Sequence, residues 1–251
     1  MKRNLFPASF MVLFVAALLL AESVVAASPE YKAAVRDAVV AEATEIANNL
    51  DALDPTNDTL VWNEDKTLVK VVTWKSQSSY EQFILPYTQT SQSEDYVFWV
   101  TLAPRMQEFC RKYLRTRPRA TKEKLDTRLK QRLGLNPDWQ YDVFVEMWVN
   151  PEDVFRPCVD PCPSDRRCEQ NFGGDIPSVK NIRDYKAFYE HLYFKSFRTA
   201  PGVPWTGLGY TYDWGSSHGK PLEQGESEFI LSPNSPYLIE QAVPTREYCE
   251  P

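Results

Sequence analysis

The chain has 251 residues, of which 43% are hydrophobic and 13% aromatic, and its formal net charge is −6. A chain with this many aromatic residues and so modest a charge folds around a core, which excludes an intrinsically disordered protein. The length suits one domain or at most two small ones, and a chain of this size buries roughly 70–75% of its unfolded surface.

The first 27 residues have the pattern of a secretory signal peptide. Lys2 and Arg3 form a short positive region, an apolar run covers residues 10–20, and small residues end the segment at Ala26 and Ala27. The apolar run is too short for a membrane span, which takes about 20 residues. We therefore expect cleavage after Ala27, or after Ala26, and a secreted or periplasmic protein without an integral membrane segment.

The remaining residues, 28–251, mix helical and strand patterns without a regular βαβ alternation. Apolar residues at spacings of three or four predict helices over residues 29–50, from Pro104 to Pro118, from Lys122 to a cap at Gly134, and over residues 178–197. Alternating or β-branched runs predict strands over residues 60–63, 67–75, 83–85, 96–102, 141–149, 208–212, 228–231 and 237–242. Together these elements predict a single α+β domain, with an antiparallel sheet and three or four helices.

All five cysteines lie after the signal segment. Exported thiols meet an oxidising compartment, so we expect two disulfides and one free thiol. The sequence leaves the connectivity open; we favour Cys158–Cys168, which closes a Pro-rich loop, and Cys110–Cys249, which ties down the C-terminal tail. The alternative is a metal site built on the C-x3-C-x5-C spacing, but no histidine lies nearby and the spacing matches no standard zinc pattern. We expect no metal and no cofactor.

Residues 111–132 form a basic block with ten basic and two acidic side chains. Such asymmetry predicts an anionic partner, such as phospholipid head groups or an acidic glycan, with Arg115 and Arg119 as contacts. Aromatic residues are scarce inside the block, which disfavours nucleic acid as the partner. The alternative is a solvated helical hairpin whose positive charge balances the acidic remainder of the chain.

The segment 205–228 combines aromatic and acidic residues. On a strand, alternation places three of its aromatic residues on one face, where with Trp205 they could bind a sugar or a base; the alternative is that these side chains belong to the core. The aromatic candidates are Trp205, Tyr210, Tyr212 and Trp214, and the catalytic candidates are Asp213, His218, Glu226 and Glu228. A carboxylate pair can perform acid–base chemistry when burial separates the two pKa values. The E-x-E form of ADP-ribosyltransferases is present at Glu226, without that family's other elements.

No P-loop, dinucleotide fingerprint, zincin motif, EF-hand loop or nucleophile elbow is present in the sequence. The sequence therefore leaves open whether the protein is an enzyme. Our leading hypothesis is a binding or envelope-associated protein that uses the aromatic segment. The alternative is a small extracellular hydrolase or transferase that uses the acidic residues and His218.

Three segments of the chain carry a resemblance: VFWVTLAP, FVEMWVNPEDVFRPCVDP, and PWTGLGYTYDWG followed by SEFIL. They resemble a group of uncharacterised exported bacterial proteins, over residues 59–249 or so. The resemblance implies a location in the periplasm or the medium, and it implies that Cys162 is the extra cysteine. It carries no activity and no functional residues.

Overall fold

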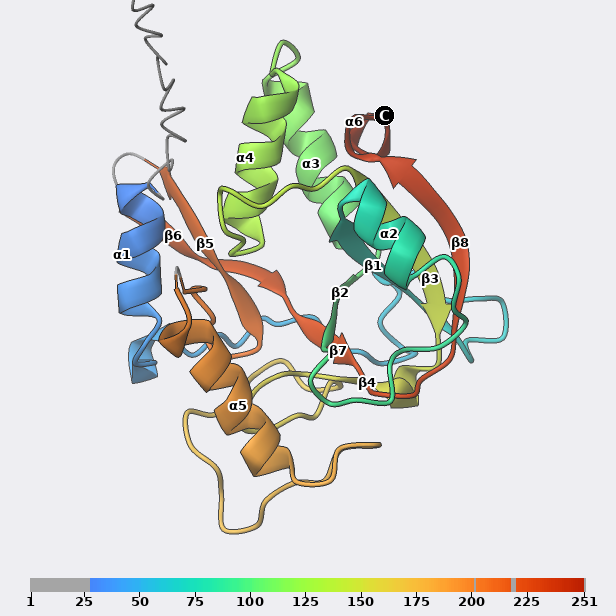
Figure 1. Ribbon diagram of the computed structural model, residues 1–251, viewed down its shortest axis with the longest axis vertical. Helices are drawn as coiled ribbons and strands as arrows, with labels where there is room; N and C mark the ends of the chain where they lie inside the picture. The colour runs from blue at the N-terminus through green and yellow to red at the C-terminus, as the bar shows by residue number, and fades with distance from the viewer. Residues whose placement is uncertain (1–27, 201, 218–219, 251) are drawn as a thin grey trace, which may run out of the picture.

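The computed structural model describes residues 28–200, 202–217 and 220–250. The signal segment and the candidate His218 therefore lie outside the described residues. The described helices are α1 (Pro29–Asp37), α2 (Gln77–Phe83), α3 (Arg105–Thr116), α4 (Lys122–Arg132), α5 (Tyr185–Arg198) and α6 (Thr245–Cys249) (Figure 1). Two short 3-10 helices cover Ala43–Glu45 and Pro151–Asp153. In this part of the chain, no helix is long and apolar enough to cross a membrane.

A six-stranded antiparallel sheet organises the fold, with the strand order β4-β7-β2-β1-β3-β8. Its strands are β1 (Val69–Lys75), β2 (Phe98–Leu102), β3 (Val143–Val149), β4 (Val154–Phe155), β7 (Phe229–Leu231) and β8 (Tyr237–Pro244). A separate hairpin consists of β5 (Tyr210–Ser217) and β6 (Lys220–Ser227). The predicted α+β architecture with an antiparallel sheet is confirmed. The described residues contain six α-helices rather than three or four, because the short helices α2 and α6, of 7 and 5 residues, add to the predicted set.

Several predicted elements differ from the structure. The strand expected over residues 60–63 is only an isolated bridge between Trp62 and Val69, and the helix expected over residues 178–197 begins at Tyr185, after its N-cap Asp184. The helix expected over residues 29–50 ends at Asp37, because the later part of that segment is extended: Leu50 N–H donates to Arg166 O and Leu53 N–H to Pro163 O. The strand expected over residues 83–85 is wrong, since Phe83 ends helix α2. The Ser76 hydroxyl caps this helix by accepting from the Ser79 N–H, a signal that the polar composition of the segment obscured.

The sheet divides in the middle, because β2 changes partners along its length. Its C-terminal end pairs with β1, through Val71–Leu102 and Val72–Thr101. Its N-terminal end pairs with β7 instead, over Phe98–Val100. The β1-β3-β8 half and the β4-β7 half are therefore joined through one short strand. Trp74 of β1 and Trp99 of β2 lie beyond the paired residues of the β1–β2 ladder, at the point where the two halves separate.

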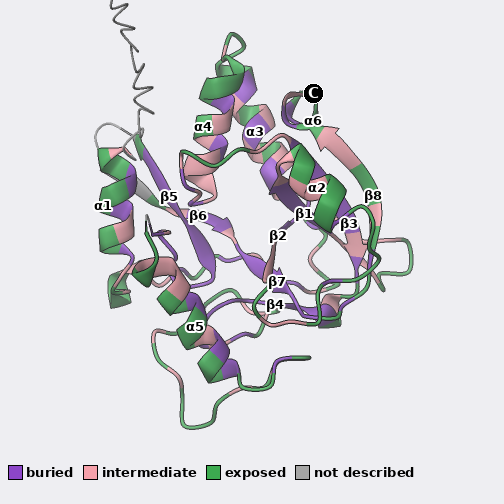
Figure 2. Cartoon of the chain, viewed as in Figure 1, coloured by how far each residue is buried: buried purple, intermediate pink, exposed green. Residues whose placement is uncertain are grey.

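Helices cover one face of this divided sheet in two places. Helices α3, α4 and α6 pack on Val72, Trp74 and Phe144 of the first half, and α5 packs on Phe155 and Ile230 of the second. The opposite face is closed by α2 and the chain before β1. The outward sides of α1, α2 and α5 remain exposed, as Figure 2 shows. The division of the sheet thus lies between two separate groups of helices.

Two disulfides tie the fold together, and both are the pairs that we favoured. Cys110–Cys249 joins α3 to the C-terminal helix, and Cys158–Cys168 closes the loop after β4. Cys162 is free and exposed. Because Cys158 and Cys168 are bonded to each other, they cannot serve as the thiolate ligands of the alternative metal site.

Candidate functional site

Two of the predicted catalytic residues, Asp213 and Glu226, lie in an ion-pair network with helix α4. Asp213 is fully buried and accepts two hydrogen bonds from the Arg128 guanidinium, at 2.9 and 2.7 Å. Glu226 accepts from Arg132 Nε at 2.7 Å, and a second nitrogen of Arg132 lies 3.8 Å from Asp213. The structure therefore brings these two carboxylates together.

The network has a structural role. Asp213 also accepts from the N–H of Gly215, so both of its oxygens are engaged by donors. A buried carboxylate held by a guanidinium in this way joins the β5–β6 hairpin to α4. Its oxygens are occupied by protein donors and do not face the solvent.

The aromatic candidates are buried and do not form an exposed face, but two of them, Trp205 and Tyr212, line a cavity. Trp205, Tyr210, Tyr212 and Trp214 are each 4–5% exposed. Three of them place their polar atoms on protein partners: Tyr210 donates to Glu45 O, Tyr212 to Asp37 Oδ2, and Trp214 to Leu135 O. The three side chains lie on one side of the hairpin, as alternation predicted, and that side is covered by α1 and by the chain that follows it.

The basic candidates Arg115 and Arg119 are exposed near the connection between α3 and α4. No ion pair among the described residues includes either of them. Exposed arginines are expected both at a contact with an anionic partner and in a solvated hairpin. Their exposure is therefore compatible with both interpretations.

A cavity of about 440 Å³ lies at the division of the sheet. Its lining comes from the helix-covered face of the sheet, from α5, from the chain after α4, and from β5. Apolar and aromatic residues dominate; among them are Val72, Trp74, Trp99, Met106, Leu135, Trp139, Tyr141, Phe144, Leu192, Val203, Trp205 and Tyr212. The volume lies within the range of about 300–1,000 Å³ that is typical of small-molecule sites.

Rigid packing holds the aromatic rings around the cavity. The Trp74 ring stacks on Tyr141, with centroids 4.6 Å apart, and its indole N–H donates to the Thr245 hydroxyl at 2.8 Å. The Trp205 ring contacts Tyr189, with centroids 5.0 Å apart. Fixed aromatic surfaces lose little conformational entropy when they contact a ligand, so this lining is preorganised.

The cavity also contains a buried acid, Glu228, which the sequence had singled out. Glu228 is 6% exposed, and its Oε1 has no hydrogen-bond partner. The Nε1 of Trp205, another lining residue, is likewise buried and without a partner. Burial raises the pKa of Glu228 to about 8; the neighbouring Trp205 indole and the Arg156 charge offset only part of this rise. At neutral pH the carboxyl is therefore mostly protonated, and it is both a donor and an acceptor.

Charged residues also line the cavity, namely Lys75, Asp95 and Lys195. Lys75 ends β1, and its Nζ is 5.4 Å from the centroid of the Phe98 ring; desolvation lowers the pKa of this ammonium group. Lys195 of α5 donates to Asp95 O. His191, on the same helix, has a side chain that is 44% exposed and lies 3.5 Å from Asp95, outside the cavity lining.

Sequence reasoning missed most of this site, because its residues are distant in the chain. The strand over residues 96–102 was predicted, and its Val97, Trp99 and Thr101 line the cavity. The sequence did not predict how β2 pairs with β1 and β7, and this pairing brings its lining residues next to Trp74 and Glu228.

Comparisons with protein-family models, with curated proteins and with solved structures find no match to this chain.

Proposed function

We propose that this protein is exported and binds a small, mainly apolar molecule in the cavity between Trp74, Trp99 and Trp205. The leader of 27 residues predicted from the sequence supports export, and the two disulfides fit an oxidising compartment such as the periplasm or the medium. The role is that of a secreted or envelope-associated binding protein.

The observation that carries this proposal is the combination of an aromatic cavity with an unpartnered buried acid. A buried polar atom without a partner costs roughly 1–3 kcal/mol. A ligand group that bonds to Glu228 or to the Trp205 N–H would recover part of that cost. The ligand class that fits has an apolar body, which contacts the aromatic rings, and one uncharged hydrogen-bonding group, such as a hydroxyl, carbonyl or amide.

Binding is favoured over the alternative of hydrolysis or group transfer. That alternative assigned acid–base roles to Asp213, Glu226, Glu228 and His218. Asp213 and Glu226 are neutralised by Arg128 and Arg132, and neither lines the cavity. A single protonated carboxyl in an apolar cavity serves recognition more directly than it serves a two-carboxylate mechanism.

The test uses N-phenyl-1-naphthylamine, a neutral probe whose fluorescence rises in apolar surroundings, and the chain from residue 28. Leu135, a half-buried lining residue, is replaced in Leu135→Trp to reduce the cavity volume. The matched control is Leu238→Trp, on a side chain of β8 that is 64% exposed.

We expect saturable binding to the unsubstituted chain and to Leu238→Trp. Overfilling a packed site costs about 1–3 kcal/mol, so Leu135→Trp should weaken binding roughly tenfold or more. Equal binding by all three proteins would mean that the probe binds outside the cavity and would contradict the proposal. A failure of the unsubstituted chain to bind the probe saturably would contradict it as well. Thermal unfolding of each variant shows whether the fold is retained.

A further inference from the structure

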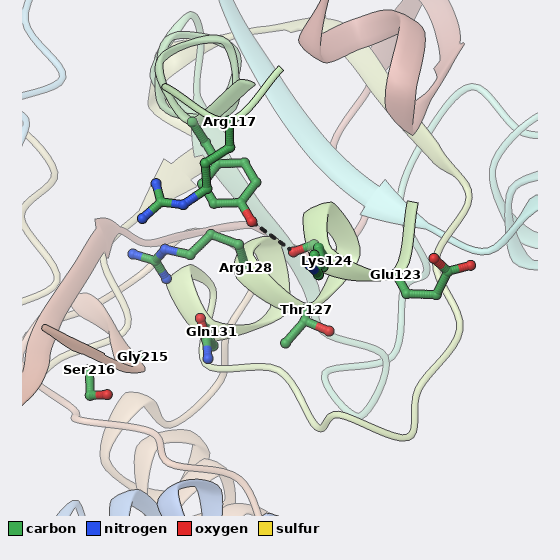
Figure 3. Close-up of a pocket in the computed structure, with 9 residues that line it drawn as sticks. Arg117, Glu123, Lys124, Thr127, Arg128, Gln131, Gly215 and Ser216 are labelled. Atoms are coloured by element: carbon green, nitrogen blue, oxygen red, sulfur yellow. Dashed lines mark hydrogen bonds between the residues drawn. The ribbon is translucent and has the colours of Figure 1, made fainter. Parts of the chain in front are cut away.

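A second pocket, of about 450 Å³, lies where the α3–α4 hairpin meets the end of β5. Its lining comes from the end of α3, from one side of α4 and from the β5 backbone, and consists of Tyr113, Arg117, Glu123, Lys124, Thr127, Arg128, Gln131, Gly215 and Ser216. In Figure 3 the side chains of Arg117 and Arg128 extend to the same side of the hairpin, with Gln131 and Ser216 below them. This pocket is distinct from the aromatic cavity and shares no lining residue with it.

Cations outnumber carboxylates in this lining. Arg117 and Lys124 are exposed, and no ion pair among the described residues includes either of them. Glu123 lies in the first turn of α4, where its own backbone N–H and the Thr121 hydroxyl lower its pKa. Among the described residues, its carboxylate forms no ion pair with Arg117 or Lys124.

Aromatic rings hold the two arginines in place. The Arg117 guanidinium lies 5.0 Å from the centroid of the Tyr113 ring, and the Arg128 guanidinium lies 4.8 Å from that of Phe109. Arg128 uses two of its nitrogens for Asp213, whereas the Arg117 side chain makes only a neutral hydrogen bond, to Thr116, among the described contacts. A guanidinium fixed on a ring loses less freedom when it binds an anion.

We propose that this pocket binds a phosphate group, through the Arg117 guanidinium and with Lys124, Gln131 and Ser216 as further donors. A planar guanidinium matches the oxygens of a phosphate with two parallel hydrogen bonds, and neutral donors complete such a site. The group can belong to a soluble phosphorylated molecule or to a phospholipid head group. The surrounding charges of the basic block, residues 111–132, attract either one over a distance of about 10 Å at moderate salt.

The test compares two substitutions that remove the same charge from the same region. Arg117→Gln removes a lining residue, whereas Arg115→Gln removes an exposed arginine two positions earlier that does not line the pocket. Binding of inorganic pyrophosphate is followed by calorimetry and by the NMR signals of the arginine Nε–H groups. In a second arm, the same proteins are sedimented with phosphatidylcholine vesicles that contain anionic phosphatidylglycerol.

We expect Arg117→Gln to weaken binding roughly tenfold or more in at least one arm, as the loss of a charged hydrogen bond predicts, and Arg115→Gln to change it by about twofold or less. Loss in the pyrophosphate arm identifies a soluble phosphate, and loss in the vesicle arm alone identifies a head group. An equal effect of both substitutions would mean general attraction to the basic hairpin and would overturn the proposal. So would the absence of binding in both arms at low salt.

Discussion

Glu228→Gln keeps the shape of a protonated glutamic acid and its capacity to donate and accept hydrogen bonds, but it cannot ionise. Glu228 is buried in the aromatic cavity, where desolvation raises its pKa from 4.5 to about 8. The folded protein therefore holds this proton more tightly than the unfolded chain does. The substitution isolates the effect of that proton on stability.

The sign and size of the effect follow from the linkage between proton binding and folding. The stabilisation due to the protonated acid is fully present below about pH 4.5 and is lost as the pH rises towards about 8. The loss is about 1.4 kcal/mol for each pH unit in this window. Between about pH 5 and pH 7 the unsubstituted protein should therefore lose about 3 kcal/mol of unfolding free energy relative to Glu228→Gln.

Urea unfolding of both proteins, with their disulfides intact, at several pH values in this range measures the difference. We use the difference because the other titrating groups are common to both proteins. The control is Glu190→Gln on α5, whose side chain is 64% exposed; its difference from the unsubstituted protein should stay constant with pH. A Glu228→Gln difference that does not change with pH would refute the argument that burial in the cavity keeps this acid protonated.

Three further predictions concern the framework. Cys110→Ser opens a bridge that spans 139 residues and should cost about 5 kcal/mol, against about 3 kcal/mol for Cys158→Ser, whose bridge spans 10; denaturant unfolding with the reverse order would contradict the loop-entropy argument. Asp213→Ala leaves the Arg128 charge without its buried partner and should cost about 3 kcal/mol or more, and a loss below about 1 kcal/mol would mean that the network does not support the hairpin. Titration of the native protein with a thiol reagent should find one reactive thiol, absent in Cys162→Ser; any other stoichiometry would contradict the pairing.

Local patterns predicted the elements whose apolar residues recur at a regular spacing. The strand over residues 141–149 and the helix from Lys122 follow from spacing alone, and both occur in the structure. The sequence left the disulfide connectivity open, but the two favoured pairs are those that form: Cys158–Cys168 closes a short loop, and Cys110–Cys249 ties down the C-terminal tail.

The parts that could not be predicted depend on long-range contacts. Residues 46–50 belong to the predicted helix of residues 29–50, but they are not helical, and the Leu50 N–H bonds instead to Arg166 in the loop that contains Cys162. The aromatic row of β5 was placed on the correct strand, yet nothing local shows that α1 covers it. Likewise, the cavity depends on an offset in β2, whose residues 101–102 pair with β1 and whose residues 98–100 pair with β7. A strand's own residues do not specify where its pairing with each neighbour begins and ends.

The most direct measurement is a crystal structure of the chain from residue 28 grown with N-phenyl-1-naphthylamine. We predict electron density for the probe between Trp74, Trp99 and Trp205, with the sheet divided at β2 as described. A cavity filled by its own side chains, or a probe bound only on the surface, would contradict the account.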